Sequence, residues 1–94
     1  MSDTGLIRSH IDKVRQVASN AAIFGGDFTS EMDKVIAEAI EHISIVKTSD
    51  PVENLQAFAG QLNVFNQVET PGTPQYQELM KYAASSFKRQ IESR

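Results

Sequence analysis

The sequence of 94 residues contains no cysteine. This absence excludes disulfide bonds, thiolate metal ligands and cysteine nucleophiles, and it leaves the redox compartment open. Long apolar runs are also absent, since no stretch approaches the roughly 18–20 residues that a helix needs to cross a bilayer. The first residues lack the basic stretch and apolar core of a signal peptide. We therefore expect a soluble protein, cytoplasmic or otherwise, with no signal peptide, no transmembrane segment and no role at a membrane.

Glycine and proline are scarce, with five and three residues, and the alternation of apolar and polar residues that is typical of strands does not occur. Hydrophobic residues make up 40% of the chain and charged residues 22%. This is the composition of an ordinary globular protein, and a chain of this length builds one hydrophobic core. The sequence therefore predicts a single domain over residues 1–94.

Four stretches of the chain carry apolar residues at the three- and four-residue spacing of an amphipathic helix. They predict helices at about residues 4–24, 28–47, 51–68 and 74–92, and therefore an all-α fold. The predicted core stripes consist of Ile7, Ile11, Val14, Ala18, Ala21, Met32, Val35, Ile36, Ala39, Ile40, Ile43, Val46, Leu55, Phe58, Leu62, Phe65, Tyr76, Met80, Ala83, Phe87 and Ile91.

Glycine and proline mark the ends of these helices. Gly25-Gly26 follows the first stretch, and glycine readily adopts the left-handed conformation in which many helices end. Asp50 precedes Pro51 at the start of the third helix, where Glu53 completes the pattern of a capping box. The segment Pro71-Gly72-Thr73-Pro74 then breaks the chain before the fourth helix.

The other helices have short polar residues at their expected starts. Ser2 or Thr4 would cap the first helix, Asp27 or Thr29 the second, and Thr73 the fourth. The connections are short, so consecutive helices can pack as antiparallel neighbours in an up-down four-helix bundle. A pair of longer hairpins that oligomerise is the alternative, because a wide apolar stripe can face either its own chain or another copy.

The third predicted helix contains no charged residue from Asn54 to Val68. A solvated helix normally carries charges on its polar face, whereas this one carries amides. We interpret the amides as a protein interface in which they set the register of the partner, and a merely polar surface is the alternative. Tyr82 is added to the candidate interface because it lies outside the apolar stripe of the fourth predicted helix. The candidate interface residues are Asn54, Gln56, Gln61, Asn63, Asn66, Gln67 and Tyr82.

Charge is unevenly distributed along the chain. Residues 27–69 hold eight acids and two lysines, a net charge of −6, whereas residues 1–26 carry +1 and residues 70–94 carry +2. The opposite signs favour a compact bundle or a head-to-tail contact between subunits, and a solvated acidic face is the simpler alternative. Because the basic residues near the C-terminus are few and mixed with acids, we expect no binding to nucleic acid.

One cluster of residue types could bind a metal ion. Glu38, Glu41 and His42 lie within about one helical turn and could donate ligands to zinc or a related metal. The metalloprotease pattern needs two histidines at fixed helical spacing, but His10 belongs to another helix. No serine, histidine or aspartate falls in a nucleophile motif. We expect no catalysis, cofactor or metal, and a metal-binding bundle that uses this cluster remains an alternative.

A further pattern spans about residues 45–68 and consists of Lys47-Thr48-Ser49-Asp50-Pro51, Leu55, Gln56, Leu62, Phe65 and Asn66. It resembles the turn and the second-helix opening of type III secretion needle and inner-rod subunits. Those subunits are small helical proteins that polymerise, so the resemblance implies a polymerising subunit with Leu55, Leu62 and Phe65 at packing contacts. The C-terminal helix of that family runs on to the chain end, whereas Pro71, Gly72 and Pro74 interrupt the corresponding region here.

These observations together predict a small, non-catalytic helical protein that acts through protein association, as an assembly subunit, an adaptor or a structural subunit. It would form a homo-oligomer or dock a partner helix against the third and fourth helices. The two alternatives are a polymerising subunit similar to the type III secretion family and a metal-binding helical bundle.

Overall fold

The computed structural model describes residues 3–67 and 74–94, and the side chains of residues 3–64 and 74–94. Within these residues it contains four α-helices and no strand, which confirms the all-α prediction. The helices are α1 (Thr4–Phe24), α2 (Thr29–Ile45), α3 (Pro51–Gln67) and α4 (Pro74–Glu92). Each end lies within two residues of its prediction, and the largest difference is the end of α2.

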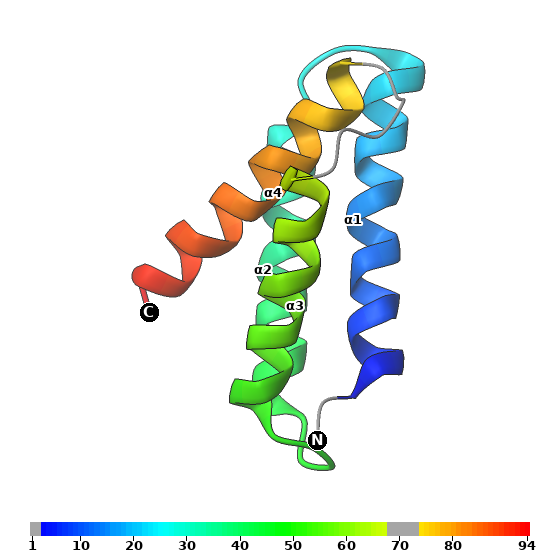
Figure 1. The fold of residues 1–94 in the computed structure, drawn as a ribbon. Helices are drawn as coiled ribbons and strands as arrows, with labels where there is room; N and C mark the ends of the chain where they lie inside the picture. The colour runs from blue at the N-terminus through cyan, green and yellow to red at the C-terminus, as the bar shows by residue number, and fades with distance from the viewer. Residues whose placement is uncertain (1–2, 68–73) are drawn as a thin grey trace.

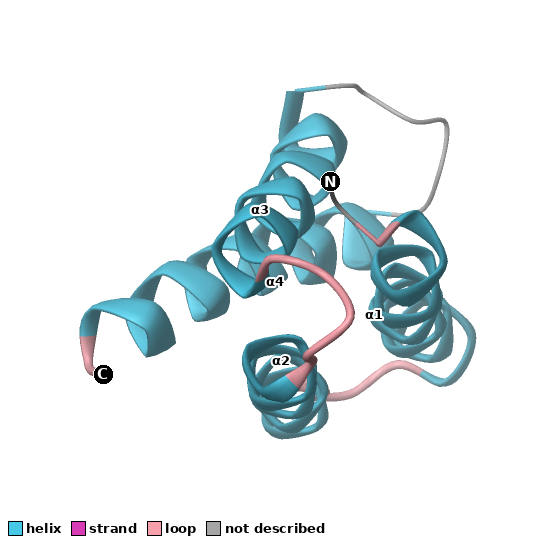
Figure 2. Ribbon diagram, turned by 90° about the horizontal axis from the view of Figure 1, so that it is seen from below, coloured by secondary structure: helices cyan, strands magenta, loops and turns pink. Residues whose placement is uncertain are grey.

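Three helices run side by side in alternating directions, and the fourth crosses them. Figure 1 shows α1, α2 and α3 with nearly aligned axes and α4 running obliquely, so that its C-terminal half points away from α1. The view from below shows the C-terminal half of α4 extending sideways beyond α2 and α3 (Figure 2). Every helix contacts each of the others. The radius of gyration is 12.9 Å, close to the roughly 12–13 Å of a compact chain of this length, so one chain closes its own core.

Among the described side chains, the core consists of the predicted stripes with few exceptions, and the side chain of Phe65 lies outside the described ones. Phe58 of α3 and Phe87 of α4 meet edge to face, with their ring centroids 5.5 Å apart. Ile91 is the main exception, since it lies on the predicted stripe of α4 but is 37% exposed. The buried apolar residues are Ile7, Ile11, Val14, Val17, Ala18, Ala21, Met32, Ile36, Ala39, Ile40, Ile43, Phe58, Leu62, Leu79, Met80, Ala83 and Phe87.

The first helix is capped by Asp3 instead of the predicted Ser2 or Thr4. The Asp3 carboxylate accepts a hydrogen bond of 3.1 Å from the backbone N–H of Leu6, an amide that has no partner within the helix. Ser2 lies outside the described residues. At the other end Gly25 takes a φ of 72°, and its N–H donates to the carbonyl of Ala21, which confirms the predicted glycine stop.

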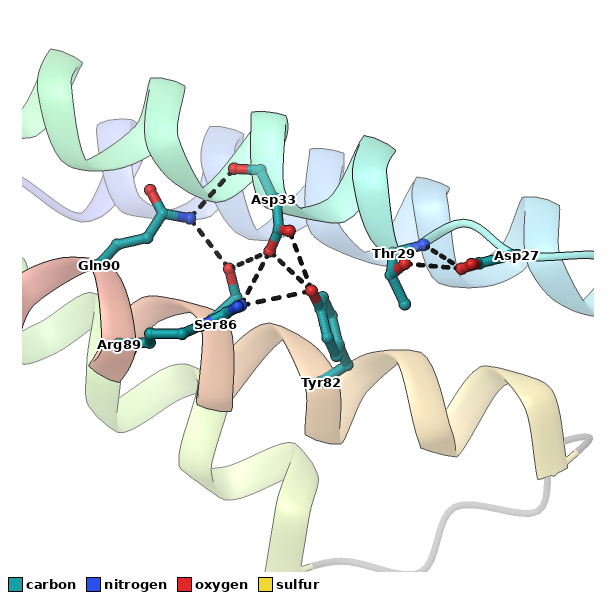
Figure 3. Close-up of polar contacts among 7 residues, drawn as sticks. All are labelled: Asp27, Thr29, Asp33, Tyr82, Ser86, Arg89 and Gln90. Atoms are coloured by element: carbon teal, nitrogen blue, oxygen red, sulfur yellow. Dashed lines mark hydrogen bonds and ion pairs between the residues drawn. The ribbon is translucent and has the colours of Figure 1, made fainter.

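The starts of α2 and α3 both use an aspartate. The carboxylate of Asp27 accepts from the N–H and the hydroxyl of Thr29, although Phe28 occupies the N-cap position itself (Figure 3). The carboxylate of Asp50 accepts a 3.0 Å bond from the N–H of Val52, as the sequence predicts. The predicted cap Thr73 and the preceding break at residues 71–72 lie outside the described residues.

Asn54 requires a correction, because its side chain is fully buried and does not lie on an exposed face. Its amide oxygen accepts a 2.7 Å hydrogen bond from the backbone N–H of Asp3, and its amide nitrogen donates a 2.7 Å bond to the hydroxyl of Ser49. The side chain therefore connects the start of α3 to the start of α1 and to the loop that follows α2. We remove it from the candidate interface.

Replacing Asn54 by Ala should lower the free energy of unfolding by about 1–3 kcal/mol, because two buried or half-buried polar groups lose their partner. Denaturant unfolding measures this change. Gln75→Ala is the matched control, since it removes an exposed amide from α4 and should change stability by less than about 0.5 kcal/mol. Equal effects of the two substitutions would show that the Asn54 bonds contribute nothing.

Candidate functional site

The outer surface of α3 carries no charged residue from Gln56 to Val64. Gln56, Gly60, Asn63 and Val64 lie on it, at the three- and four-residue spacing that places side chains on one face. Val64 is 53% exposed. We refer to these four residues as the α3 ridge.

Gly60 at the centre of the α3 ridge has no role in the packing of its own chain. A Cβ atom added at this position would meet no other atom within 4 Å. Its backbone is helical, and the only described residues with positive φ are Gly25 and Gly26. Because glycine in a helix interior costs about 1 kcal/mol relative to alanine, Gly60 lowers stability without any gain that the single chain shows.

A groove follows each side of the α3 ridge. The groove between α3 and α4 has a volume of about 290 Å³, with Leu62, Phe87 and Ile91 as its apolar surface and Lys88 and Glu92 among its exposed residues. Asn63 of the α3 ridge lines this groove as well. Its apolar character comes from the oblique course of α4, which leaves Ile91 partly uncovered.

The groove on the other side lies between α3 and α1 and has a volume of about 430 Å³. Ile7 and Ile11 of α1 form its apolar surface together with Ala57 of α3. Exposed polar residues line its edges, among them Arg8, Asp12 and Gln61. The α3 ridge is therefore an uncharged strip between two grooves that have apolar floors and charged outer edges.

The structure separates the predicted interface residues. Gln56 and Asn63 lie on the α3 ridge, and Gln61 is exposed but lines the groove toward α1. The side chains of Asn66 and Gln67 lie outside the described ones. Sequence reasoning missed Gly60, which carries no side chain to draw attention. A glycine inside a helical stripe was the signal that could have found it.

Tyr82, the seventh predicted interface residue, belongs instead to a polar cluster between α2 and α4 (Figure 3). Its hydroxyl lies 3.0 and 2.9 Å from the two carboxylate oxygens of Asp33. Ser86 donates to the same carboxylate over 2.7 Å, and Arg89 forms an ion pair with it at 3.1 Å. Gln90 donates to the Asp33 carbonyl and to the Ser86 hydroxyl.

This cluster holds helices together and does not present a nucleophile. Burial raises the pKa of Asp33, but the hydrogen bonds from Ser86 and Tyr82 and the charge of Arg89 outweigh this effect and hold the pKa below its usual value. A carboxylate of low pKa is a poor general base. Ser86 is fully buried, so its hydroxyl cannot reach a substrate.

A second polar contact joins α1 and α2. Nε2 of His10 lies 3.0 Å from Nδ1 of His42, and the two rings meet edge to face. His10 is only 2% exposed, and its Nδ1 is buried without a hydrogen-bond partner among the described residues. Burial lowers the pKa of His10 below 6.5, and the nearby Lys13 and His42 lower it further, whereas Glu38 opposes them. The sequence offered no signal for this pairing, since the two histidines are far apart along the chain.

The histidine pair does not complete the metal site that the sequence suggested. Glu38, Glu41 and His42 are all exposed on α2. Across residues 3–64 and 74–94, no three or more histidine, aspartate or glutamate side chains gather in a way that could hold a metal ion. The geometry therefore does not favour the metal-binding alternative.

Comparisons with protein-family models, with curated proteins and with solved structures find no match to this chain. The resemblance to type III secretion subunits therefore stays a prediction. The described helices include none that is long and apolar enough to span a membrane. The fold and the α3 ridge define the molecule only as a small helical bundle with an uncharged helix face.

The buried histidine predicts a dependence of stability on pH. The lowered pKa of His10 means that the unfolded chain binds this proton more readily than the folded chain. The free energy of unfolding should therefore fall as the pH drops below about 6.5, by up to about 1.4 kcal/mol for each unit by which the pKa is lowered. The contribution of His10 becomes constant below its folded-state pKa.

Thermal unfolding between pH 7.5 and 5.5 tests this dependence above the range in which carboxylates titrate. His10→Phe should flatten the slope, because it removes the buried titratable group. The control is His42→Gln, which changes the exposed partner and leaves a buried histidine at position 10. If His10→Phe keeps the full slope, the buried histidine is not its source.

Proposed function

We propose that this protein is a small, non-catalytic helical subunit that acts through protein association, and that the α3 ridge is its binding face. The observation that carries the proposal is the open position of Gly60 at the centre of an uncharged, exposed strip. Glycine is favoured where another backbone approaches closely. A partner helix that crosses α3 at Gly60 explains a residue that the single chain does not need.

The surroundings of Gly60 fit such a partner. Amides at Gln56 and Asn63 flank it at one turn on either side, and they can both donate and accept hydrogen bonds. The grooves beside the ridge offer apolar contacts, including Ile91 from α4 and Ile7 from α1. A centre that lacks charged residues, surrounded by a polar and charged rim, is usual in protein interfaces.

Site-specific photo-cross-linking in the cells that make the protein tests the proposal. A photo-activatable residue at position 56 or 63 should form cross-links to protein, because both positions face the bound partner. The matched control places the same residue at position 9 or 16, which are exposed on α1 and line neither groove. Mass spectrometry identifies the products. Equal yields at ridge and control positions, or none at either ridge position, would contradict a binding face on α3.

A second test uses the opposite effects that Gly60→Ala should have. Alanine raises the helix propensity of α3, so the free energy of unfolding of the monomer should rise by about 1 kcal/mol. The added methyl group should hold the partner helix away and lower the cross-linking yield from position 56 at least about threefold, since even one misplaced methyl group in a packed contact costs about 1 kcal/mol or more.

Gly5→Ala is the control for this substitution. Gly5 is exposed in the first turn of α1, and an added Cβ would lie at an ordinary contact distance of 3.6 Å from the carboxylate of Asp3. The Gly5→Ala substitution should not lower the free energy of unfolding, and the cross-linking yield from position 56 should stay unchanged. A Gly60→Ala variant that is more stable and cross-links as well as the wild type would show that no backbone approaches Gly60.

A further inference from the structure

We infer that the partner of the α3 ridge is a second copy of this chain, packed ridge against ridge about a two-fold axis close to Gly60. This inference rests on the proposed function and names the partner that the face would bind. In such a contact, α3 of one copy crosses α3 of the other in the reverse direction. Gly60 then lies at the crossing, where the two backbones come closest.

The absence of charge on the ridge is what a two-fold axis requires. Residues close to the axis of a symmetric dimer face their own copies, so any charge there would meet a like charge. The ridge runs from Gln56 to Val64 without a charged residue. A partner of different sequence imposes no such condition, because a charge on this face could then be met by an opposite charge.

The amide side chains on the α3 ridge can hydrogen-bond to the amide side chains of a second copy. A carboxylate only accepts hydrogen bonds and an ammonium group only donates them, whereas an amide does both. Gln56 and Asn63 of one copy can therefore bond to the same residues of the other. Val64 is 53% exposed and adds an apolar surface that gains from being covered.

The outer edge of the α4 groove is also self-complementary in charge. Lys88 and Glu92 lie one turn apart on α4, both exposed, and neither takes part in an ion pair among the described residues. The reversed direction of a second copy brings its Glu92 toward Lys88 of the first. Opposite charges at the edge and none at the centre match a symmetric dimer.

The first experiment measures absolute mass by light scattering after size-exclusion chromatography, from about 1 μM to about 100 μM protein, where a moderate dimer dissociates by mass action. The chain has a mass of 10.4 kDa, and the expected result is a rise toward twice that value with concentration. A constant monomer mass over the whole range would overturn the inference.

The second experiment places charges on both sides of Gly60. Gln56→Lys combined with Asn63→Lys makes a positive ridge, and Gln56→Glu combined with Asn63→Glu makes a negative one. Each variant alone should dimerise at least about tenfold more weakly, because like charges then face each other across the axis. An equimolar mixture of the two should recover a dimer, since opposite charges now meet. Circular dichroism checks that the helices remain formed.

The matched control carries the same charges at Ser9 and Gln16, two exposed residues of α1 with the same seven-residue spacing. These variants should dimerise like the wild type. A dimer that survives either charged ridge, or a mixture that stays monomeric, would overturn the ridge-to-ridge contact.

The mass measurement and the cross-linking together distinguish a failure of the dimer from a failure of the binding face. If the wild type is a monomer but positions 56 and 63 cross-link to a different protein in cells, the ridge is a binding face and the second copy is excluded as its partner. If neither position cross-links to anything, the proposed function itself fails.

Discussion

The oblique packing of α4 is the constraint on which the rest of the structure depends. Its apolar face covers the core, where Phe87 meets Phe58 of α3 and Met80 is almost fully buried. The cluster around Asp33 fixes the rotation of α4, because Tyr82, Ser86 and Arg89 on successive turns all contact one carboxylate of α2. With α4 held in this orientation, its last turns diverge from the bundle (Figure 1), and Ile91 remains partly exposed beside α3.

Three buried polar side chains connect helices that the apolar core alone would leave free to slide. Asn54 ties the start of α3 to Asp3, Ser86 joins α4 to Asp33, and His10 joins α1 to His42. Such groups lose free energy when their partners are absent, so they favour one arrangement over others of similar apolar burial. His10 differs from the other two because its second ring nitrogen is buried without a partner among the described residues. Its burial also lowers its pKa, so protonation of His10 weakens the contact between α1 and α2.

The α3 ridge contains residues that lower the stability of the single chain. Gly60 weakens the helix, and the amides of Gln56 and Asn63 beside it form no hydrogen bond among the described residues that would offset the loss. Local choices that lower the stability of an isolated domain are expected where function sets the residue. The ridge and its two grooves are therefore a part of the surface that single-chain folding does not explain.

The sequence by itself determined the number of helices, their bounds and most of the core. Periodicity and end signals are local, and Gly25, Asp50 and Pro51 act within a few residues of where they stand. Only the tertiary structure decided which polar residues face inward. Asn54 and Tyr82 look like surface residues on a helical repeat, but Asp3 and Asp33, which are distant in the sequence, draw them into hydrogen bonds. The crossing of α4 and the openness around Gly60 likewise depend on where whole helices lie, because the space around a residue is set by the packing of other segments and not by its neighbours along the chain.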